Sequence, residues 1–205
     1  RDFSIMGQTT ILTLIQLGGL GIVIFGAVLA LLLGQALSVR ESVAMQDLLN
    51  SQTLGRIGTM IGFIFTTTII VETLGTVMLY HLWDGSAAIE NSRQQWFYSV
   101  FHSISAFCNA GFGLYSDSFV SYKNSWQMYG VICPLIILGG LGFGVLYNIT
   151  HVTIDSIRRY LWRKFNTKQV FANSYPVKFQ LQTKIVITMT IALIIIGTLL
   201  IMIFE

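Results

Sequence analysis

The sequence predicts an all-α integral membrane protein in which one short segment enters the membrane without crossing it. Of the 205 residues, 54% are hydrophobic and only 10% are charged, and the mean hydropathy is +0.70. A soluble domain of this size is much less apolar. The apolar residues form continuous runs and do not alternate with polar ones, which favours membrane helices over the strands of a barrel.

The charged residues are distributed as in a protein with loops on both sides of a membrane. Seven of the twelve Lys and Arg residues lie between Arg158 and Lys184, and the formal net charge is +3. This clustering is typical of a cytoplasmic loop and argues against a nucleic-acid partner. Counting back through the spans then places residues 86–125 outside and residues 34–56 inside.

Four apolar runs are long enough to cross about 30 Å of hydrocarbon, which takes roughly 20 helical residues. We expect each run to be one helix because backbone polar groups cannot stay unpaired in lipid. The third run contains Pro134, which should kink that helix because proline lacks the N–H that continues the hydrogen-bond ladder. The predicted helices are residues 5–33, 57–82, 126–149 and 185–204.

One aromatic segment is too short to cross. Residues 95–107, QWFYSVFHSISAF, would form a helix only about 20 Å long. The next six residues, 108–113, read CNAGFG and suit extended backbone, which membranes tolerate only where it is buried in protein or lines a water-filled cavity. The sequence therefore predicts a short pore helix followed by a re-entrant loop.

A loop of this kind can bind a cation through its backbone carbonyls, which replace the oxygen atoms of the hydration shell. Gly111 can adopt φ values that other residues avoid, so that successive carbonyls point the same way. The short helix also directs the negative end of its dipole at the loop. The alternative is an ordinary extracellular loop that is rich in turn residues.

A repeated string supports a unit made of a helix, a re-entrant loop and a second helix. The string LGGLG occurs at residues 17–21 and again at residues 138–142, each time inside an apolar run. Glycine pairs in apolar helices usually let another helix pack closely, and we favour this interpretation over a ligand-binding loop.

Two titratable residues in the apolar segments are candidates for function. Glu72 is the only acid within a predicted span, and an ionised carboxylate near the membrane centre costs at least about 2.5 kcal/mol, so it needs a partner or a proton. Glu72 either belongs to a cation pathway or is a clamp that accepts hydrogen bonds. His102 lies on the short helix and should hydrogen-bond within its scaffold. A less favoured hypothesis pairs Glu72 and His102 as the acid and base of an intramembrane enzyme.

The sequence FHSISAFCNAGF at residues 101–112 resembles the pore loop of the Trk/Ktr/HKT potassium transporter superfamily. Three further strings agree with that family in order and spacing. They are QLGGLGI at residues 16–22, VETLG at residues 71–75 and LGGLGF at residues 138–143. The resemblance covers nearly the whole chain and is strongest to the bacterial Ktr membrane subunit, KtrB.

The resemblance implies a pore in which four units of one polypeptide surround a single K⁺ pathway. The key filter glycine of the family matches Gly111. The filter and its supporting residues then match Cys108 at the loop entrance, the carbonyl-bearing Asn109, Ala110, Gly111 and Phe112, and Gly113, with Glu72 and His102 as supports. Many members carry Asn at the position of Cys108 and Ser or Ala at that of Gly113. These differences affect side chains more than carbonyls.

The family layout divides the chain into parts of three units. We expect the chain to be a fragment that lacks three of the four filter loops and the intramembrane gating loop, and so cannot conduct alone. The expected parts are the second helix of unit one (1–33), a cytoplasmic linker (34–56), unit two (57–150), a basic cytoplasmic linker (151–184) and the first helix of unit three (185–205).

The resemblance also implies the setting of the protein. It implies a multi-pass, non-enzymatic subunit in a bacterial plasma membrane, with the lipid bilayer as its surroundings and no organic cofactor in this segment. A homodimer and a cytoplasmic nucleotide-binding regulatory subunit are the expected partners. A Na⁺ transporter of the same superfamily and a non-conducting membrane scaffold are the alternatives.

Overall fold

The computed structural model describes residues 3–36, 55–83, 91–115, 119–165 and 177–204. All the regular structure in these ranges is helical, which confirms the predicted fold class. Most of the expected linker 34–56 lies outside the described residues, as do residues 166–176 of the second linker. The chain divides into two compact units, Arg1–Gly140 and Leu141–Glu205, and each is described by itself.

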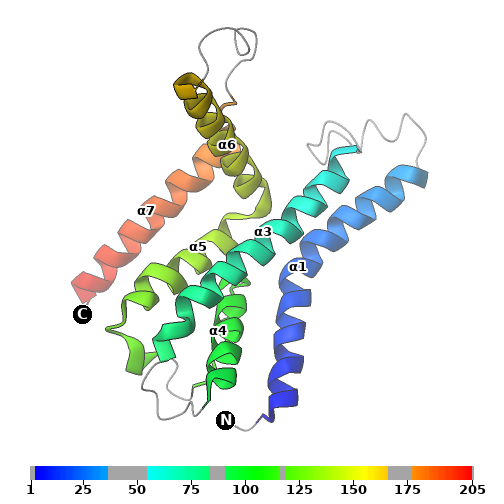
Figure 1. Ribbon diagram of the computed structural model, residues 1–205. Helices are drawn as coiled ribbons and strands as arrows, with labels where there is room; N and C mark the ends of the chain where they lie inside the picture. Colours follow the sequence, from blue (N-terminus) through cyan, green and yellow to red (C-terminus); the bar gives the residue numbers. More distant parts are fainter. Residues whose placement is uncertain (1–2, 37–54, 84–90, 116–118, 166–176, 205) are drawn as a thin grey trace. The chain divides into compact units, whose positions relative to one another are not determined.

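Among the described residues, the first unit contains three helices of 16 residues or more (Figure 1). They are α1 (Ile5–Ala36), α3 (Gly55–Leu79), which continues into the 3₁₀ turn η1 (Tyr80–Trp83), and α4 (Ser92–Phe107). Helix α4 is only 16 residues long and packs mainly against α3, with further contacts to α1. It therefore has the half-length expected of a segment that enters a membrane without crossing it.

Helix α3 has one face toward the protein and another toward its surroundings. Residues spaced three or four apart are buried, and this stripe includes polar side chains. Its members are Ile64, Thr68, Glu72, Thr76 and Leu79. Ile69, Leu74 and Val77 on the other side are more than half exposed, as is usual for side chains that face lipid.

The expected third helix, residues 126–149, is interrupted. A π-helical turn η3 (Met128–Ile132) leads into α5 (Cys133–Leu141), and α6 (Phe143–Phe165) begins after Gly142. Gly142 has a φ of +84°, and a left-handed residue ends the regular hydrogen-bond ladder. The break therefore lies at Gly142, while Pro134 is the second residue of α5, in the first turn of a helix, where a missing N–H is accommodated.

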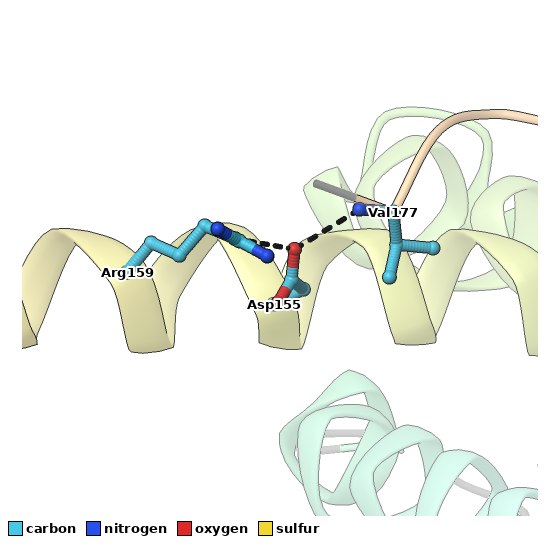
Figure 2. A network of polar contacts seen from close by, with 3 residues as sticks. All are labelled: Asp155, Arg159 and Val177. Carbon is cyan, nitrogen blue, oxygen red and sulfur yellow. Dashed lines mark hydrogen bonds and ion pairs between the residues drawn. The ribbon is translucent and has the colours of Figure 1, made fainter. Parts of the chain in front are cut away.

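The described part of the second unit contains α6 and α7 (Leu181–Phe204), which contact each other. The Asn148 side-chain oxygen accepts a hydrogen bond from the Gln180 backbone N–H at 3.0 Å. Asp155 accepts one from the Val177 N–H at 3.2 Å and one from the Arg159 Nε at 2.8 Å (Figure 2). Two acceptors on α6 thus fix the segment that leads into α7. The first part of the expected linker 151–184 is helical, because α6 continues to Phe165.

Two of the described helices, Gly58–Trp83 and Leu181–Phe204, are long and apolar enough to cross a membrane. The interrupted pair Met128–Leu141 and Phe143–Leu161 is a third candidate. Side chains of α7 are mostly exposed. Such a helix needs lipid or other helices around it, because water would leave its apolar surface unburied.

A candidate ion-binding loop

The loop begins where α4 ends. The Asn109 N–H bonds to the Ala106 carbonyl at 3.1 Å and the Ala110 N–H bonds to the Ser105 carbonyl at 2.9 Å. Asn109 has a φ of +54°, so these bonds form the usual helix ending in which one left-handed residue satisfies the last carbonyls. Asparagine is one of the few non-glycine residues that adopt this conformation readily.

A second left-handed residue follows two positions later. Gly111 has a φ of +72°, and a Cβ built on it would have no atom within 4 Å. The glycine is therefore required by the backbone conformation and not by lack of space. Asn109, Gly111, Phe112 and Gly113 are exposed, while Cys108 and Ala110 are half-buried. The structure thus presents an open stretch of irregular backbone beside a short helix.

Two glycines, one from each LGGLG string, let the start of the loop approach the neighbouring helices. A Cβ on Gly19 would lie 2.7 Å from the Cys108 Sγ. A Cβ on Gly139 would collide with the Phe107 carbonyl oxygen and lie 3.0 Å from the Asn109 Nδ2. The glycines act in close packing, as predicted, but the segment that comes close is the pore loop.

Ser105 holds the loop from within α4. Its hydroxyl donates a hydrogen bond to the Phe112 carbonyl at 2.7 Å, and its own carbonyl accepts from Ala110. The Phe112 carbonyl was expected to face an ion, and one of its two lone pairs is used by Ser105. Sequence reasoning did not single out Ser105, although a serine inside an aromatic half-length helix is the signal that could have done so.

Glu72 is buried at the junction of α1, α3 and α4. Its Oε2 accepts a hydrogen bond from the Gln16 Nε2 at 3.0 Å, and its backbone carbonyl accepts from the Ser103 Oγ at 2.8 Å. The Cys108 Sγ lies 3.9 Å from the Gln16 Oε1 as a donor. The Oε1 of Glu72 has no partner among the residues the structure describes. Gln16 therefore links Glu72 to the entrance of the loop.

His102 is 1% exposed and connects two backbone groups. Its Nδ1 lies 2.8 Å from the Tyr98 carbonyl, and its Nε2 accepts the Leu114 N–H at 3.3 Å. Only a neutral imidazole with its proton on Nδ1 can make both hydrogen bonds. Within the described ranges no hydrogen bond joins His102 to Glu72, so the structure does not assemble the acid and base of the enzyme hypothesis.

Two hollows flank the loop. The larger, about 660 Å³, lies between α1 and the loop and is lined by residues that include Ile15, Gly19 and Ala110. The smaller, about 290 Å³, is lined by Ser105, Gly111 and other residues of the loop, of α4, and of η3 and α5. No group of three His, Cys, Asp or Glu residues that could hold a metal ion occurs among the described positions.

The helices and the loop define a helical membrane protein built around a re-entrant segment. Residues 2–205 match the sequence model of TrkH, described as a cation transport protein, and the chain belongs to this family. The predicted resemblance is thereby confirmed, and the protein is a membrane protein of this transporter family.

Several relatives are similar over most or all of the chain. It is 32% identical to the Ktr system potassium uptake protein B of Bacillus subtilis and 30% identical to the protein of that name from Vibrio alginolyticus, in both cases over 100% of this chain and 40% of the relative. It is 30% identical to the potassium/sodium uptake protein NtpJ of Enterococcus hirae over 70% of this chain and 31% of the relative. The chain thus spans about 40% of the length of the first two relatives.

Proposed function

We propose that the chain is part of the pore-forming subunit of a K⁺ uptake system and supplies one quarter of its selectivity filter. Carbonyls of Asn109, Ala110, Gly111 and Phe112 would bind K⁺ as the transported ion, with Cys108 at the entrance. The observation that carries the proposal is the pair of left-handed residues at 109 and 111. Alternation with right-handed or extended residues turns successive carbonyls toward one side.

The surroundings of the loop suit this role. Helix α4 ends at Phe107, so the negative end of its dipole lies beside the loop and favours a cation. Close packing on Gly19 and Gly139 holds the start of the loop, and the hydrogen bond from Ser105 holds the Phe112 carbonyl and leaves it one lone pair for an ion. Preorganised carbonyls bind an ion without the cost of ordering the loop first.

Potassium is the first candidate for the transported ion, because two relatives that match the whole chain are named potassium uptake proteins. A relative named as a potassium/sodium uptake protein makes Na⁺ the second candidate. Transport by such a pore is passive movement through a filter and requires no catalytic residue.

The assembly is proposed from the same relatives. The names describe components of a Ktr system, which supports a membrane assembly of several subunits. We propose that the protein is a multi-pass plasma-membrane subunit that forms a homodimer and binds a cytoplasmic nucleotide-binding regulatory subunit. In this arrangement residues 57–150 form the second of four units, with residues 1–33 and 185–205 as helices of its neighbours. Residues 34–56 and 151–184 are then cytoplasmic linkers.

Replacing Gly111 tests the proposal. The full-length protein containing this segment would be expressed in bacteria lacking K⁺ uptake, and rubidium entry measured with increasing Na⁺. Serine at Gly111 must adopt an unfavourable left-handed φ at a cost of about 1–2 kcal/mol, so we expect the preference for K⁺ over Na⁺ to fall about tenfold.

Gly62→Ser is the matched control, because Gly62 lies on α3, has no positive φ, and would have no atom within 4 Å of an added Cβ. This variant should transport like the unaltered protein. Rubidium entry and ion preference that are both unchanged in Gly111→Ser would remove Gly111 from the filter and contradict the proposed function.

A further inference from the structure

The far end of the loop, after Gly113, is held by a cluster of rings that is separate from the proposed ion-binding carbonyls. Trp83 and His102 lie at its centre, each 1% exposed, with ring centroids 4.9 Å apart. We call this group the aromatic cluster. Its members are Trp83, Tyr98, His102, Tyr115, Phe119 and Tyr122.

The rings of the cluster come from η1, from α4 and from the segment after the loop, and they meet around Tyr115. Tyr115 stacks on Trp83 with centroids 5.7 Å apart and on His102 with centroids 6.0 Å apart. Tyr98 of α4 meets Tyr115 edge to face at 5.3 Å. Aromatic pairs in these geometries contribute beyond the area that they bury. Tyr115 is therefore fixed between η1 and α4.

Hydrogen bonds fix the direction of the rings. The Trp83 Nε1 donates to the Ser99 Oγ at 2.8 Å, and the Tyr122 hydroxyl donates to that of Tyr115 at 3.1 Å. The Nε2 of His102 accepts the Leu114 N–H, which joins the cluster to the backbone one residue beyond the loop. A Cβ added to Gly113 would lie 3.7 Å from the same nitrogen.

We propose that His102 is a positioning residue that sets the K⁺ over Na⁺ preference by holding Leu114, and through it the end of the loop at Gly113. This inference rests on the proposed filter function. Carbonyls kept apart suit the larger ion, whereas a loop free to contract can also surround Na⁺. His102 itself does not contact the ion.

The chemistry of His102 distinguishes positioning from simple space filling. A buried apolar ring would fill the same volume without the desolvation cost of two polar nitrogens. Both nitrogens are instead used, one toward the helix at Tyr98 and one toward Leu114. The second hydrogen bond bridges 12 positions of sequence and has no role in the stability of α4 alone.

Two substitutions at one position separate these roles. Glutamine at position 102 can still place an oxygen near the site of the Nε2, while asparagine reaches only the site of the Nδ1. In the full-length protein, His102→Asn should lower the K⁺ over Na⁺ preference of rubidium entry by about tenfold, the change expected from one lost hydrogen bond. His102→Gln should retain most of it. His151→Asn, on an exposed part of α6, is the control and should be unchanged.

The outcomes decide the inference. Preference equal to the unaltered protein in His102→Asn, at equal amounts in the membrane, overturns it. If His102→Asn does not reach the membrane, Tyr115→Leu removes the ring stacked on His102 and should produce the same shift. Loss of both variants from the membrane would make the cluster a folding element and also overturn the inference.

The Gly111→Ser variant separates this result from the proposed function. If Gly111→Ser changes ion preference and His102→Asn does not, only the role of His102 is wrong. If neither changes it, the filter assignment itself is wrong.

Discussion

Glu72 shows how a buried acid is accommodated at the scale of a single residue. Sequence reasoning left two interpretations, a cation pathway or a clamp. The carboxylate accepts from Gln16 of α1 and the backbone carbonyl accepts from Ser103 of α4. Both bonds join α3 to a neighbouring helix, and these contacts favour the clamp.

Removal of the carboxylate should therefore destabilise the protein. Glu72→Ala leaves the Gln16 amide without its acceptor in a partly buried site, at a cost of about 1 kcal/mol in the free energy of unfolding. Thermal unfolding of the full-length protein in detergent would show a lower Tm. Glu72→Gln keeps an oxygen acceptor and should lose less. Equal Tm values for Glu72→Ala and the unaltered protein would contradict the clamp.

The sequence located the loop and some of the residues that support it, but it missed others. Cys108 to Phe112 were predicted because a half-length helix and a family-specific string both point to them. Gln16, Ser103 and Ser105 were missed. Gln16 and Ser103 act through partners 56 and 31 positions away, and such pairings arise from tertiary packing, which hydrophobic periodicity does not encode.

At the scale of elements, each LGGLG string contains one glycine in close contact with the loop. Gly19 and Gly139 face Cys108 and Phe107, whereas Gly18 has no atom within 4 Å of a Cβ position and Gly140 has its nearest at 3.9 Å. The helix period explains the difference, because adjacent residues point about 100° apart on a helix. Adjacent glycines therefore differ in whether they tolerate an added side chain.

We expect Gly139→Ala to be the most harmful alanine substitution in these strings. The added methyl meets the Phe107 carbonyl, which is backbone and cannot rotate away, and overpacking of this kind costs about 1–3 kcal/mol. Rubidium entry and Tm of the full-length protein should both fall. Gly140→Ala is the paired control, with little change. A similar loss in both variants would mean that helix packing in general, and not the loop contact, is the cause.

The interrupted third helix was beyond sequence reasoning for a physical reason. Pro134 is a visible helix breaker, and we expected the irregularity there. A glycine inside an apolar run does not reveal the sign of its φ, because glycine populates both signs about equally. The left-handed φ of Gly142 therefore could not be predicted from the sequence.

At the scale of the whole molecule, the fold class was the most predictable property. The described residues are helical wherever they are regular, as expected from apolar runs matched to the thickness of a membrane. The amino-acid composition and the lengths of the apolar runs directly indicate whether a chain is surrounded by lipid or by water. The positions of loops within such a bundle depend instead on particular contacts.

The proposed filter also predicts how the chain behaves alone. If the filter is a ring of four loops, as proposed, this chain supplies one of them, and the chain reconstituted into liposomes should give no rubidium flux above that of empty vesicles. The full-length protein, at equal amounts, should give K⁺-selective flux. Selective flux from the chain alone would mean that a complete filter does not require the other units of a longer polypeptide.

The contacts of the loop start define the smallest part that can be exchanged between relatives. Cys108 rests on Gly19 of α1, and Phe107 rests on Gly139 of α5. Recombination at a boundary between α1 and α3 would join a loop to a foreign helix surface, although both parental segments were intact. The smallest segment that can be exchanged intact is therefore the stretch from α1 through α5. We expect substitutions in the two glycine-bearing helices and in the loop to be correlated as such sequences diverge.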